Sequence, residues 1–490
     1  MTKRAKSRRL SSQVLDVGVE PAKHDDVEED DEDCWDGMDR PTMFVGVCLL
    51  LFVIVFVSIP VGISANRDPS PTMAPTHFRK PVFKIFKMFF YNISGEALDD
   101  PASPQSQALD FVVYDDELAL DETDPSALQR YVLMTIFYAN GGEDWSFKNN
   151  AWGSEMNECQ WDYVMCSNDT TVVGLDFLNL GLTGTLMSEL LHLSSLRSLD
   201  IAGNEFTYDE FPSILYNMTT LVFLYVDNNM WRGSISSEIA ALSSLEHFFL
   251  NGNDMTGTLP NELGTFPNMT YFNVALNRFR GKPFPLVANW SKLERLDLGN
   301  NRFSGSIPSE LGSIAPQMEQ FLVPQNRFTG TVPTELGAWT EMRKFFVSRN
   351  FDFEPFNIPT EFGRWSNLEI LLMDSISLEG PIPTEFGGFS SVTRMVLQQN
   401  DLTGPIPTEL SQCSNLLELS INSNELTAAI PSELGELTAL TKLFLQFNDL
   451  RGEMPSEICD LVSMHNLESL GSDCLGFGPL VECPCCTRCT

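Results

Sequence analysis

Residues 172–458 repeat one pattern of apolar and polar positions with a period of about two dozen residues. The pattern is LxxLxLxxNxLxGxIPxELGxL, and LERLDLGNNRFSGSIPSELGSI at residues 293–314 follows it closely. Twelve copies align, 24 to 26 residues apart, and two of them carry Leu180 and Ile376 where the others carry Asn. A period of this length indicates a stack of similar units, each packed only on its neighbours. The ten central asparagines are Asn204, Asn229, Asn253, Asn277, Asn301, Asn326, Asn350, Asn400, Asn424 and Asn448.

The LxL pair within each unit alternates with period two, which is typical of a β-strand. Leu296 and Leu298 are therefore predicted to point inward, and Asp297 to point to the opposite face. Each unit would add one strand to a parallel sheet. The Asn amide can donate to and accept from the backbone of the turn that leaves the strand, so we predict a ladder of Asn side chains. Replacing Asn301 with Ala should destabilise the protein by about 1 to 3 kcal/mol.

The LxGxIP turn resembles the plant-type leucine-rich repeat of receptor-like proteins, receptor kinase ectodomains and polygalacturonase inhibitors, and the resemblance covers residues 101–490. CQWDYVMC at Cys159–Cys166 is similar to that family's N-terminal cap, where a Trp lies between two disulfide-bonded cysteines. SPQxxAL, QRYVLMTIFYANGG and VECPCCTRC resemble a membrane-anchored branch found in diatoms and related algae. The resemblance implies an α/β solenoid, a right-handed superhelix with a concave parallel β-sheet. It also implies a helical, disulfide-bonded N-terminal cap and a Cys-rich C-terminal cap.

An uncharged, mostly apolar run of 23 residues, 43–65, lies between Arg40 and Arg67. As a helix it would span roughly 35 Å, which is enough to cross a bilayer. A cleaved signal peptide is the alternative, but the highly charged leader of 42 residues is unusual for one. We therefore predict one transmembrane helix at residues 43–65. Residues 1–42 are predicted to be a disordered cytosolic tail, because their charge blocks cannot bury enough apolar surface to fold.

The orientation of this span rests on two opposing signals. Arg67, Arg79 and Lys80 follow the run closely, so the local charge rule does not favour a cytosolic N-terminus. Against it, nine cysteines and five Asn-x-Ser/Thr sequons lie C-terminal to the run, and both are features of an extracellular or lumenal compartment. We therefore predict that the repeats lie outside the cell, at the plasma membrane. The predicted glycosylation sites are Asn92, Asn168, Asn217, Asn268 and Asn289.

Residues 66–101 are rich in Pro and Ser and are predicted to be an extracellular linker. Its apolar and basic stretch at 79–91 can lie on the outer leaflet or pack onto the next domain, and the sequence does not choose. Residues 102–171 are predicted to form a helical stalk and an N-terminal cap. Two helices would begin at Ser103-Pro104 and Asp124-Pro125, each a cap residue followed by proline. Their apolar faces would cover the open end of the stack.

Six cysteines crowd residues 459–490, the predicted C-terminal cap, and with Cys159 and Cys166 they are predicted to form disulfides. Fifteen pairings of the six are possible, and the sequence selects none. Thiolates at this spacing can also bind zinc, but an extracellular location favours disulfides, so no metal site is predicted. Cys413 makes the count odd and is predicted to be a buried free thiol rather than an intermolecular partner. The six are Cys459, Cys474, Cys483, Cys485, Cys486 and Cys489.

Residues four and six positions before each ladder position are predicted to face outward on the concave side of the sheet. In repeats three to five and seven to nine these positions form two aromatic or apolar strips, and contiguous exposed side chains of this kind are typical of partner sites. Two other interpretations stay open. A register shifted by one residue would place these side chains in the core, or the aromatics stack only on one another. The residues are Phe223, Tyr225, His247, Phe249 and Tyr271, then Leu322, Phe346 and Leu372.

The formal net charge of −35 and the lack of clustered Lys and Arg argue against a nucleic-acid partner. The sequence contains no nucleophile–base motif, phosphate loop or HExxH, so it is predicted not to be an enzyme and to need no cofactor. We interpret the chain as a single-pass membrane protein without a kinase domain. It would recognise an external protein, peptide or glycan on its concave face and need a co-receptor to signal. The alternative, implied by the resemblance, is an inhibitor of a polysaccharide hydrolase or a structural cell-wall protein.

Overall fold

The computed structural model describes residues 80–145, 152–475 and 480–490, which belong to one compact unit at residues 75–490. Within these ranges, no helix combines the length and the apolar character needed to cross a bilayer. The predicted membrane span at 43–65 and the predicted tail at 1–42 lie outside the described residues.

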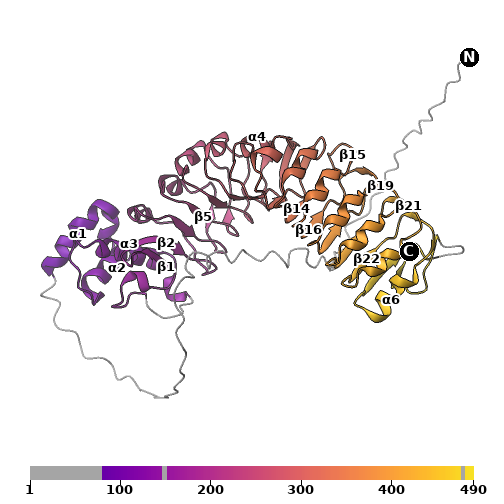
Figure 1. The fold of residues 1–490 in the computed structure, drawn as a ribbon. Coiled ribbons are helices and arrows are strands. Elements are labelled where there is room, and N and C mark those ends of the chain that lie inside the picture. The colour runs from indigo at the N-terminus through magenta and orange to yellow at the C-terminus, as the bar shows by residue number, and fades with distance from the viewer. Residues whose placement is uncertain (1–79, 146–151, 476–479) are drawn as a thin grey trace, which may run out of the picture. The chain divides into compact units, whose positions relative to one another are not determined.

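Successive repeats form one sheet of 15 strands, in which β1 and β2 are antiparallel and the later neighbours are parallel (Figure 1). Each of the twelve predicted repeats contributes one strand, and β25 and β27 continue the sheet into the predicted C-terminal cap. The strands, in sheet order, are β1 Val164–Ser167, β2 Thr171–Asp176, β3 Ser198–Asp200, β5 Phe223–Tyr225, β7 His247–Phe249, β8 Tyr271–Asn273, β10 Arg295–Asp297, β12 Gln320–Leu322, β14 Lys344–Phe346, β16 Ile370–Leu372, β18 Arg394–Val396, β20 Glu418–Ser420, β22 Lys442–Phe444, β25 Ser469–Ser472 and β27 Arg488–Cys489.

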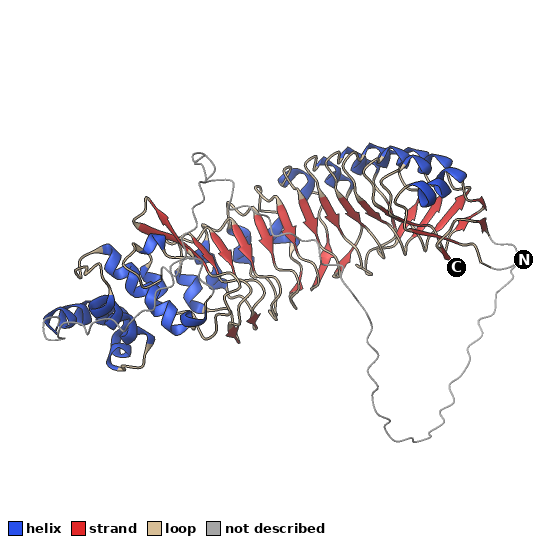
Figure 2. Ribbon diagram, turned by 90° about the horizontal axis from the view of Figure 1, so that it is seen from below, coloured by secondary structure: helices blue, strands red, loops and turns tan. Residues whose placement is uncertain are grey.

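Most coils add a second short strand after the ladder position. These strands pair into small sheets and are β4 Thr207–Tyr208, β6 Met230–Trp231, β9 Arg280–Gly281, β11 Arg302–Ser306, β13 Arg327–Thr329, β15 Phe356–Asn357, β17 Leu378–Gly380, β19 Asp401–Gly404, β21 Glu425–Ala428, β23 Asp449–Leu450, β24 Gly452–Glu453 and β26 Val481–Glu482. A helical turn then returns the chain to the main sheet. Figure 2 shows the main strands side by side, with helical turns away from them. These turns are η5 Ser188–His192, η6 Ser213–Asn217, η7 Ser237–Leu242, η8 Asn261–Thr265, α4 Phe284–Val287, α5 Leu311–Ile314, η9 Thr334–Ala338, η10 Thr360–Arg364, η11 Thr384–Gly388, η12 Thr408–Gln412, η13 Ser432–Glu436 and α6 Ser456–Met464.

The interior of the coil is built as the repeat pattern predicts. Leu296 and Leu298 are fully buried, and the equivalent Phe and Val residues of the two neighbouring coils, Phe272, Val274, Phe321 and Val323, are buried beside them. The glycine of the ELG or EFG segment allows coils to approach closely. At Gly387 a Cβ atom would lie 2.6 Å from the carbonyl oxygen of Glu409 in the next coil, so a larger residue would push the two apart. The repeat's leucines and glycine therefore set the spacing of the sheet strands.

The ten ladder asparagines hydrogen-bond the backbone of adjacent coils. In Asn301, Oδ1 accepts from the Phe279 N–H at 2.9 Å, and Nδ2 donates to the carbonyl oxygen of Val274 at 2.8 Å. Nδ2 also approaches the carbonyl oxygens of Leu298 and Gly299 in its own turn. Each amide thus satisfies backbone groups that the stack hides from water.

At the two positions without Asn, the backbone N–H of the residue itself donates to the ladder asparagine of the next coil. Asn204 Oδ1 accepts from the N–H groups of both Leu180 and Leu182, at 3.1 and 2.9 Å. Asn400 Oδ1 likewise accepts from Ile376 and Leu378, at 3.0 and 3.1 Å. The asparagine that follows each gap therefore serves two backbone donors, where Asn301 serves one.

The N-terminal cap contains the two predicted helices. α2 spans Pro104–Asp110 and continues as the π-helical turn η2, Phe111–Asp115, and α3 spans Pro125–Ala139. Their predicted starts are confirmed, since Ser103 Oγ accepts from the Ser106 N–H and Asp124 Oδ1 from the Ser126 N–H. α3 packs against η5 of the first repeat, and the short turns η3 Gly142–Asp144 and η4 Glu158–Gln160 follow it.

The described part of the predicted linker is helical, and its apolar and basic stretch packs onto the next domain, which is one of the two placements that the sequence leaves open. α1 spans Lys80–Ser94 and is followed by η1, Gly95–Asp99. Phe86 and Phe90 are buried, and the Phe90 ring stacks on Tyr131 of α3 with 3.9 Å between centroids. Apolar residues at helical spacing gain more by burial against α3 than they would in an extended linker. The opposite side of α1, with Ile85 and Met88, is exposed.

A fully buried arginine ties the cap together. Arg130 donates from Nε and Nη2 to the Asp116 carboxylate at 2.6 and 2.9 Å, and its guanidinium carbon lies 4.5 Å from the Trp161 ring centroid. Nη1 is 3.8 Å from the Glu158 carboxylate. A buried charge is tolerated only when it is paired and hydrogen-bonded in this way.

All eight cysteines predicted to form disulfides are paired. The bonds join Cys159 to Cys166, Cys459 to Cys485, Cys474 to Cys489, and Cys483 to Cys486. The sulfurs of Cys474, Cys483 and Cys486 lie within 4.8 Å of one another, but each belongs to a disulfide rather than to a set of free thiolates. Cys413 is a buried free thiol, as predicted.

Candidate ligand-binding face

The outward side of the main sheet, which we call the sheet face, carries the predicted binding residues. In β5, Leu224 is fully buried while Phe223 and Tyr225 on either side of it are half-buried. Phe248 in β7 is fully buried between half-buried His247 and Phe249. In β5 and β7 the register is therefore the predicted one, and a one-residue shift that would place their aromatics in the core is wrong. Tyr271 in β8 is buried.

The first strip forms an aromatic cluster of Phe223, Tyr225, His247, Phe249 and Tyr271, carried by β5, β7 and β8. His247 lies at its centre. Its ring centroid is 4.7 Å from Phe223 and 4.2 Å from Tyr271, on which it stacks, and its Nδ1 is hydrogen-bonded to the Tyr225 hydroxyl at 2.8 Å. The Tyr225 and Phe249 rings lie 5.1 Å apart. The aromatics therefore stack on one another as the second interpretation holds, yet they do so on the outward face.

The aromatic cluster is uncharged near pH 7, and an ion pair lies at its edge. Burial and the nearby Arg295 lower the pKa of His247 to about 4, so the ring is neutral near pH 7. Burial raises the pKa of Tyr271 to about 12. The Arg295 guanidinium carbon lies over the Tyr271 ring, 4.7 Å from its centroid, and Arg295 Nη2 is 3.2 Å from the Glu319 carboxylate. His247 therefore contributes a neutral aromatic ring to the cluster and does not act as an acid near pH 7.

The second strip is a continuous apolar row. The strand register places Leu322, Phe346 and Leu372 directly beside one another, and Val396 extends the row by one strand. Leu322 and Phe346 are 5% and 8% exposed, so lateral packing hides more of them than their outward direction alone suggests. The sequence analysis missed Val396, although it lies four positions before Asn400, where the rule for outward residues would have found it.

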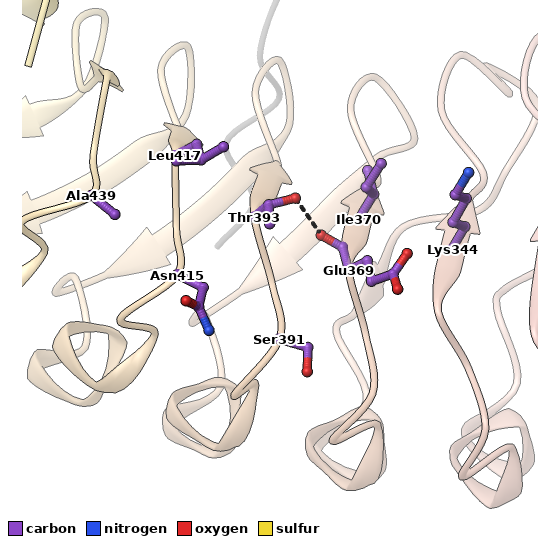
Figure 3. Close-up of a pocket in the computed structure, with 8 residues that line it drawn as sticks. All are labelled: Lys344, Glu369, Ile370, Ser391, Thr393, Asn415, Leu417 and Ala439. Carbon is purple, nitrogen blue, oxygen red and sulfur yellow. Dashed lines mark hydrogen bonds between the residues drawn. The ribbon is translucent and has the colours of Figure 1, made fainter. Parts of the chain in front are cut away.

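A hollow of about 650 Å³, lined by both polar and apolar side chains, adjoins this row where the chain enters the strands. Figure 3 shows its lining side chains, which come from five successive coils. The Thr393 hydroxyl donates to the carbonyl oxygen of Glu369 at 3.1 Å, and Asn415 Nδ2 donates to that of Ser390 at 2.8 Å. None of the hollow's lining residues is among the predicted binding residues, which were chosen only from outward strand positions. The lining residues are Lys344, Glu369, Ile370, Ser391, Thr393, Asn415, Leu417 and Ala439.

The predicted glycosylation sites differ in exposure. Asn92, Asn168, Asn217 and Asn289 are exposed, whereas Asn268 is half-buried and its Oδ1 accepts from Lys292 Nζ at 2.7 Å. None of them lies in a strand of the main sheet. Glycans attached at these positions would therefore not be attached to the strands of the sheet face. Whether the five sequons are glycosylated stays a prediction.

Comparison with known sequences identifies the repeat. Residues 292–314 match the family model described as Leucine Rich Repeat. The chain is 50% identical over 60 residues to receptor-like protein kinase BRI1-like 3 of Arabidopsis thaliana, and 46% identical over 55 residues to serine/threonine-protein kinase BRI1-like 1 of the same plant. These alignments cover 12% and 11% of this chain and only 5% of either relative.

Comparison with solved structures covers more of the fold. The crystal structure of PEPR1–AtPEP1 matches 67% of this chain with a TM-score of 0.55 and 28% identity, and this covers 49% of that chain. The leucine-rich-repeat ectodomain of the receptor kinase GASSHO1/SCHENGEN3 from Arabidopsis thaliana, in complex with CASPARIAN STRIP INTEGRITY FACTOR 2, matches 64% with a TM-score of 0.51 and 25% identity, covering 43% of that chain. A TDR receptor matches 59% with a TM-score of 0.52 and 26% identity, covering 53% of that chain. The chain therefore corresponds to about half of each of these structures.

Proposed function

We propose that this chain, a leucine-rich-repeat protein of the plant type, captures an extracellular peptide or protein on its sheet face as a receptor-like or adhesion protein. One observation carries the proposal. Aromatic and apolar side chains lie side by side on the outward face of consecutive strands, although the coil already has a complete core on the inward face. Contiguous apolar side chains on an outer surface mark a partner site more often than a solvated face.

The shape of the face favours a chain-like partner. Neighbouring strands lie about 4.8 Å apart, so the strands from β5 to β18 offer roughly 40 Å of continuous surface. A peptide or an exposed protein segment can lie across such a surface and place successive side chains over the aromatic cluster and the apolar row. The structure of the similar GASSHO1/SCHENGEN3 ectodomain is of a complex with CASPARIAN STRIP INTEGRITY FACTOR 2, and this supports the proposal.

Anchoring and signalling complete the proposal. The apolar run at residues 43–65 would hold the chain in the plasma membrane with the repeats outside, and a partner protein would carry the signal inward. Glycosylation at the exposed sequons would be consistent with this location. Protease protection and deglycosylation of the full chain on intact cells test the topology, and it is refuted if the repeats resist added protease until the cells are permeabilised.

Ligand capture is tested by selecting a phage-displayed library of random 12-residue peptides on the full chain. Peptides enriched on the wild type should bind Phe249→Ala at least about tenfold more weakly, because an aromatic anchor typically contributes more than 1 kcal/mol. Phe351→Ala is the matched control, since Phe351 is 74% exposed and lies in a turn outside the cluster. It should bind these peptides as the wild type does.

Two outcomes would contradict the proposal. If Phe249→Ala and Tyr225→Ala bind the enriched peptides as tightly as the wild type, the aromatic cluster is not the capture site. If both variants instead melt well below the wild type and below Phe351→Ala, the cluster serves the stability of the sheet.

A further inference from the structure

A single carboxylate lies between the aromatic cluster and the apolar row. Across the outward row of the sheet, Phe249 pairs with Asn273, Asn273 with Asp297, and Asp297 with Leu322. Asp297 is 8% exposed, and its Oδ1 accepts from the Gly299 N–H at 2.9 Å. An acid is thus held at the centre of an otherwise apolar or neutral row.

The local hydrogen bond does not require an acid. Asn273 on the adjacent strand makes the same bond, accepting from the Ala275 N–H at 3.0 Å through its amide oxygen. Asp200 in the second repeat also accepts from the residue two positions on, Ala202, at 2.9 Å. An amide therefore meets the needs of this turn, and the negative charge at Asp297 is unexplained by the fold.

The nearest outward cation on the same strand is engaged elsewhere. Arg295 lies over the Tyr271 ring and pairs with Glu319. Among the residues that the structure describes, no Lys, Arg or His forms an ion pair with Asp297. Burial raises the pKa of this carboxyl to about 7, which shows the cost of hiding the charge without a cation. A ligand cation would remove that cost.

From this placement we propose that Asp297 selects ligands with a basic side chain, an Arg or Lys seated between two apolar anchors of one extended peptide. The inference rests on the proposed capture of peptides by the sheet face and names the chemistry of the peptide. Phe249 lies two strands from Asp297 on one side and Phe346 two strands away on the other. Two strand spacings are roughly 10 Å, or about three residues of extended chain. The recognised motif is therefore an apolar residue, two intervening residues, Arg or Lys, two further residues and a second apolar residue.

The experiment is the same 12-residue phage selection, run in parallel on the full-length wild type, Asp297→Asn and Asp200→Asn. Asp297→Asn should fold, because Asn273 shows that an amide makes the same bond on the neighbouring strand. Asp200→Asn is the matched control, since it makes the same change at the same repeat position, at the outer edge of the aromatic cluster beside Tyr225 rather than between the two strips. Wild type and Asp200→Asn should enrich peptides with the basic motif. Asp297→Asn should keep the apolar pair and lose the enrichment of Arg and Lys.

A peptide enriched on the wild type gives the second readout. It should bind Asp297→Asn about tenfold more weakly or worse, and its analogue with citrulline or Gln in place of the basic residue should bind both proteins alike. If the wild type enriches apolar peptides without a basic residue, the role of Asp297 is refuted while capture by the sheet face stands. If no peptide is enriched on the wild type, both are refuted. Equal loss with Asp200→Asn would refute the local role of Asp297, because it would mean that general negative charge drives the selection.

Discussion

The two gaps in the asparagine ladder provide a sharp test of how the stack is held together. Asn400 and Asn424 occupy the same position in adjacent repeats, and each Nδ2 donates to the carbonyl oxygen 27 residues earlier, at 2.9 and 3.0 Å. They differ in the acceptor. Asn424 Oδ1 accepts one backbone N–H, from Leu402, whereas Asn400 Oδ1 accepts two, from Ile376 and Leu378. Asn400→Ala therefore removes one more buried hydrogen bond than Asn424→Ala does.

The expected magnitudes follow from the groups left without partners. Asn424→Ala leaves one buried N–H without an acceptor and removes the donor to neighbouring carbonyl oxygens, so it should cost about 3 kcal/mol. Asn400→Ala leaves a second buried N–H unsatisfied, which should add about 1 to 3 kcal/mol. Both side chains are almost fully buried, at 8% and 9% exposed, so water does not replace the lost bonds in either variant.

Because a repeat array can open locally, the assay should report on single coils as well as on the whole protein. Denaturant titration gives the loss of total stability, and hydrogen exchange gives the protection of the Ile376 and Leu378 amides. Asn400→Ala should expose these two amides, while Asn424→Ala should chiefly affect the Leu402 amide. If Asn400→Ala is no more destabilising than Asn424→Ala, and the Ile376 amide stays protected, the second bond to Asn400 does not stabilise the stack.

Three further predictions follow from buried polar groups. Burial raises the pKa of Asp297 from 3.8 to about 7, so the contribution of this residue to stability should fall by up to about 4 kcal/mol as the pH rises from about 4 to 7. Relative to the wild type, Asp297→Asn should be more stable at pH 8 and equally stable near pH 4, and equal stability at pH 8 would show that the carboxylate is not destabilising. Arg130→Met should lower the free energy of unfolding by about 3 to 5 kcal/mol, because the Asp116 carboxylate stays buried without its cation; a stability like that of the wild type would show that the pair is dispensable. Burial raises the pKa of the Cys413 thiol to about 11, so a maleimide should modify it only after denaturation, and peptide mapping that finds it modified in the native protein would refute its burial.

Local patterns in the sequence were enough to predict the elements that depend on contacts between residues close together in the chain. The LxL alternation gave the direction of Leu296 and Leu298, because a strand turns successive side chains to opposite faces whatever lies around it. The starts of α2 and α3 followed from Ser103 and Asp124, since a cap bond reaches only two or three residues along the chain. The same reasoning placed the aromatic cluster and the apolar row on the outward face in the correct register.

Contacts between segments distant in the sequence were decided only by the tertiary structure. The sequence left two placements open for the apolar stretch at 79–91, and the stacking of Phe90 on Tyr131 selects packing onto the next domain, because no local pattern specifies which surface a helix will meet. The pairing of six C-terminal cysteines depended on which sulfurs the folded cap brings within bonding distance. The isolation of Asp297 came from Arg295 turning toward Tyr271 and Glu319 on neighbouring strands. A repeat thus specifies its own strand and turn, whereas the partner of each outward side chain depends on the coils stacked on either side.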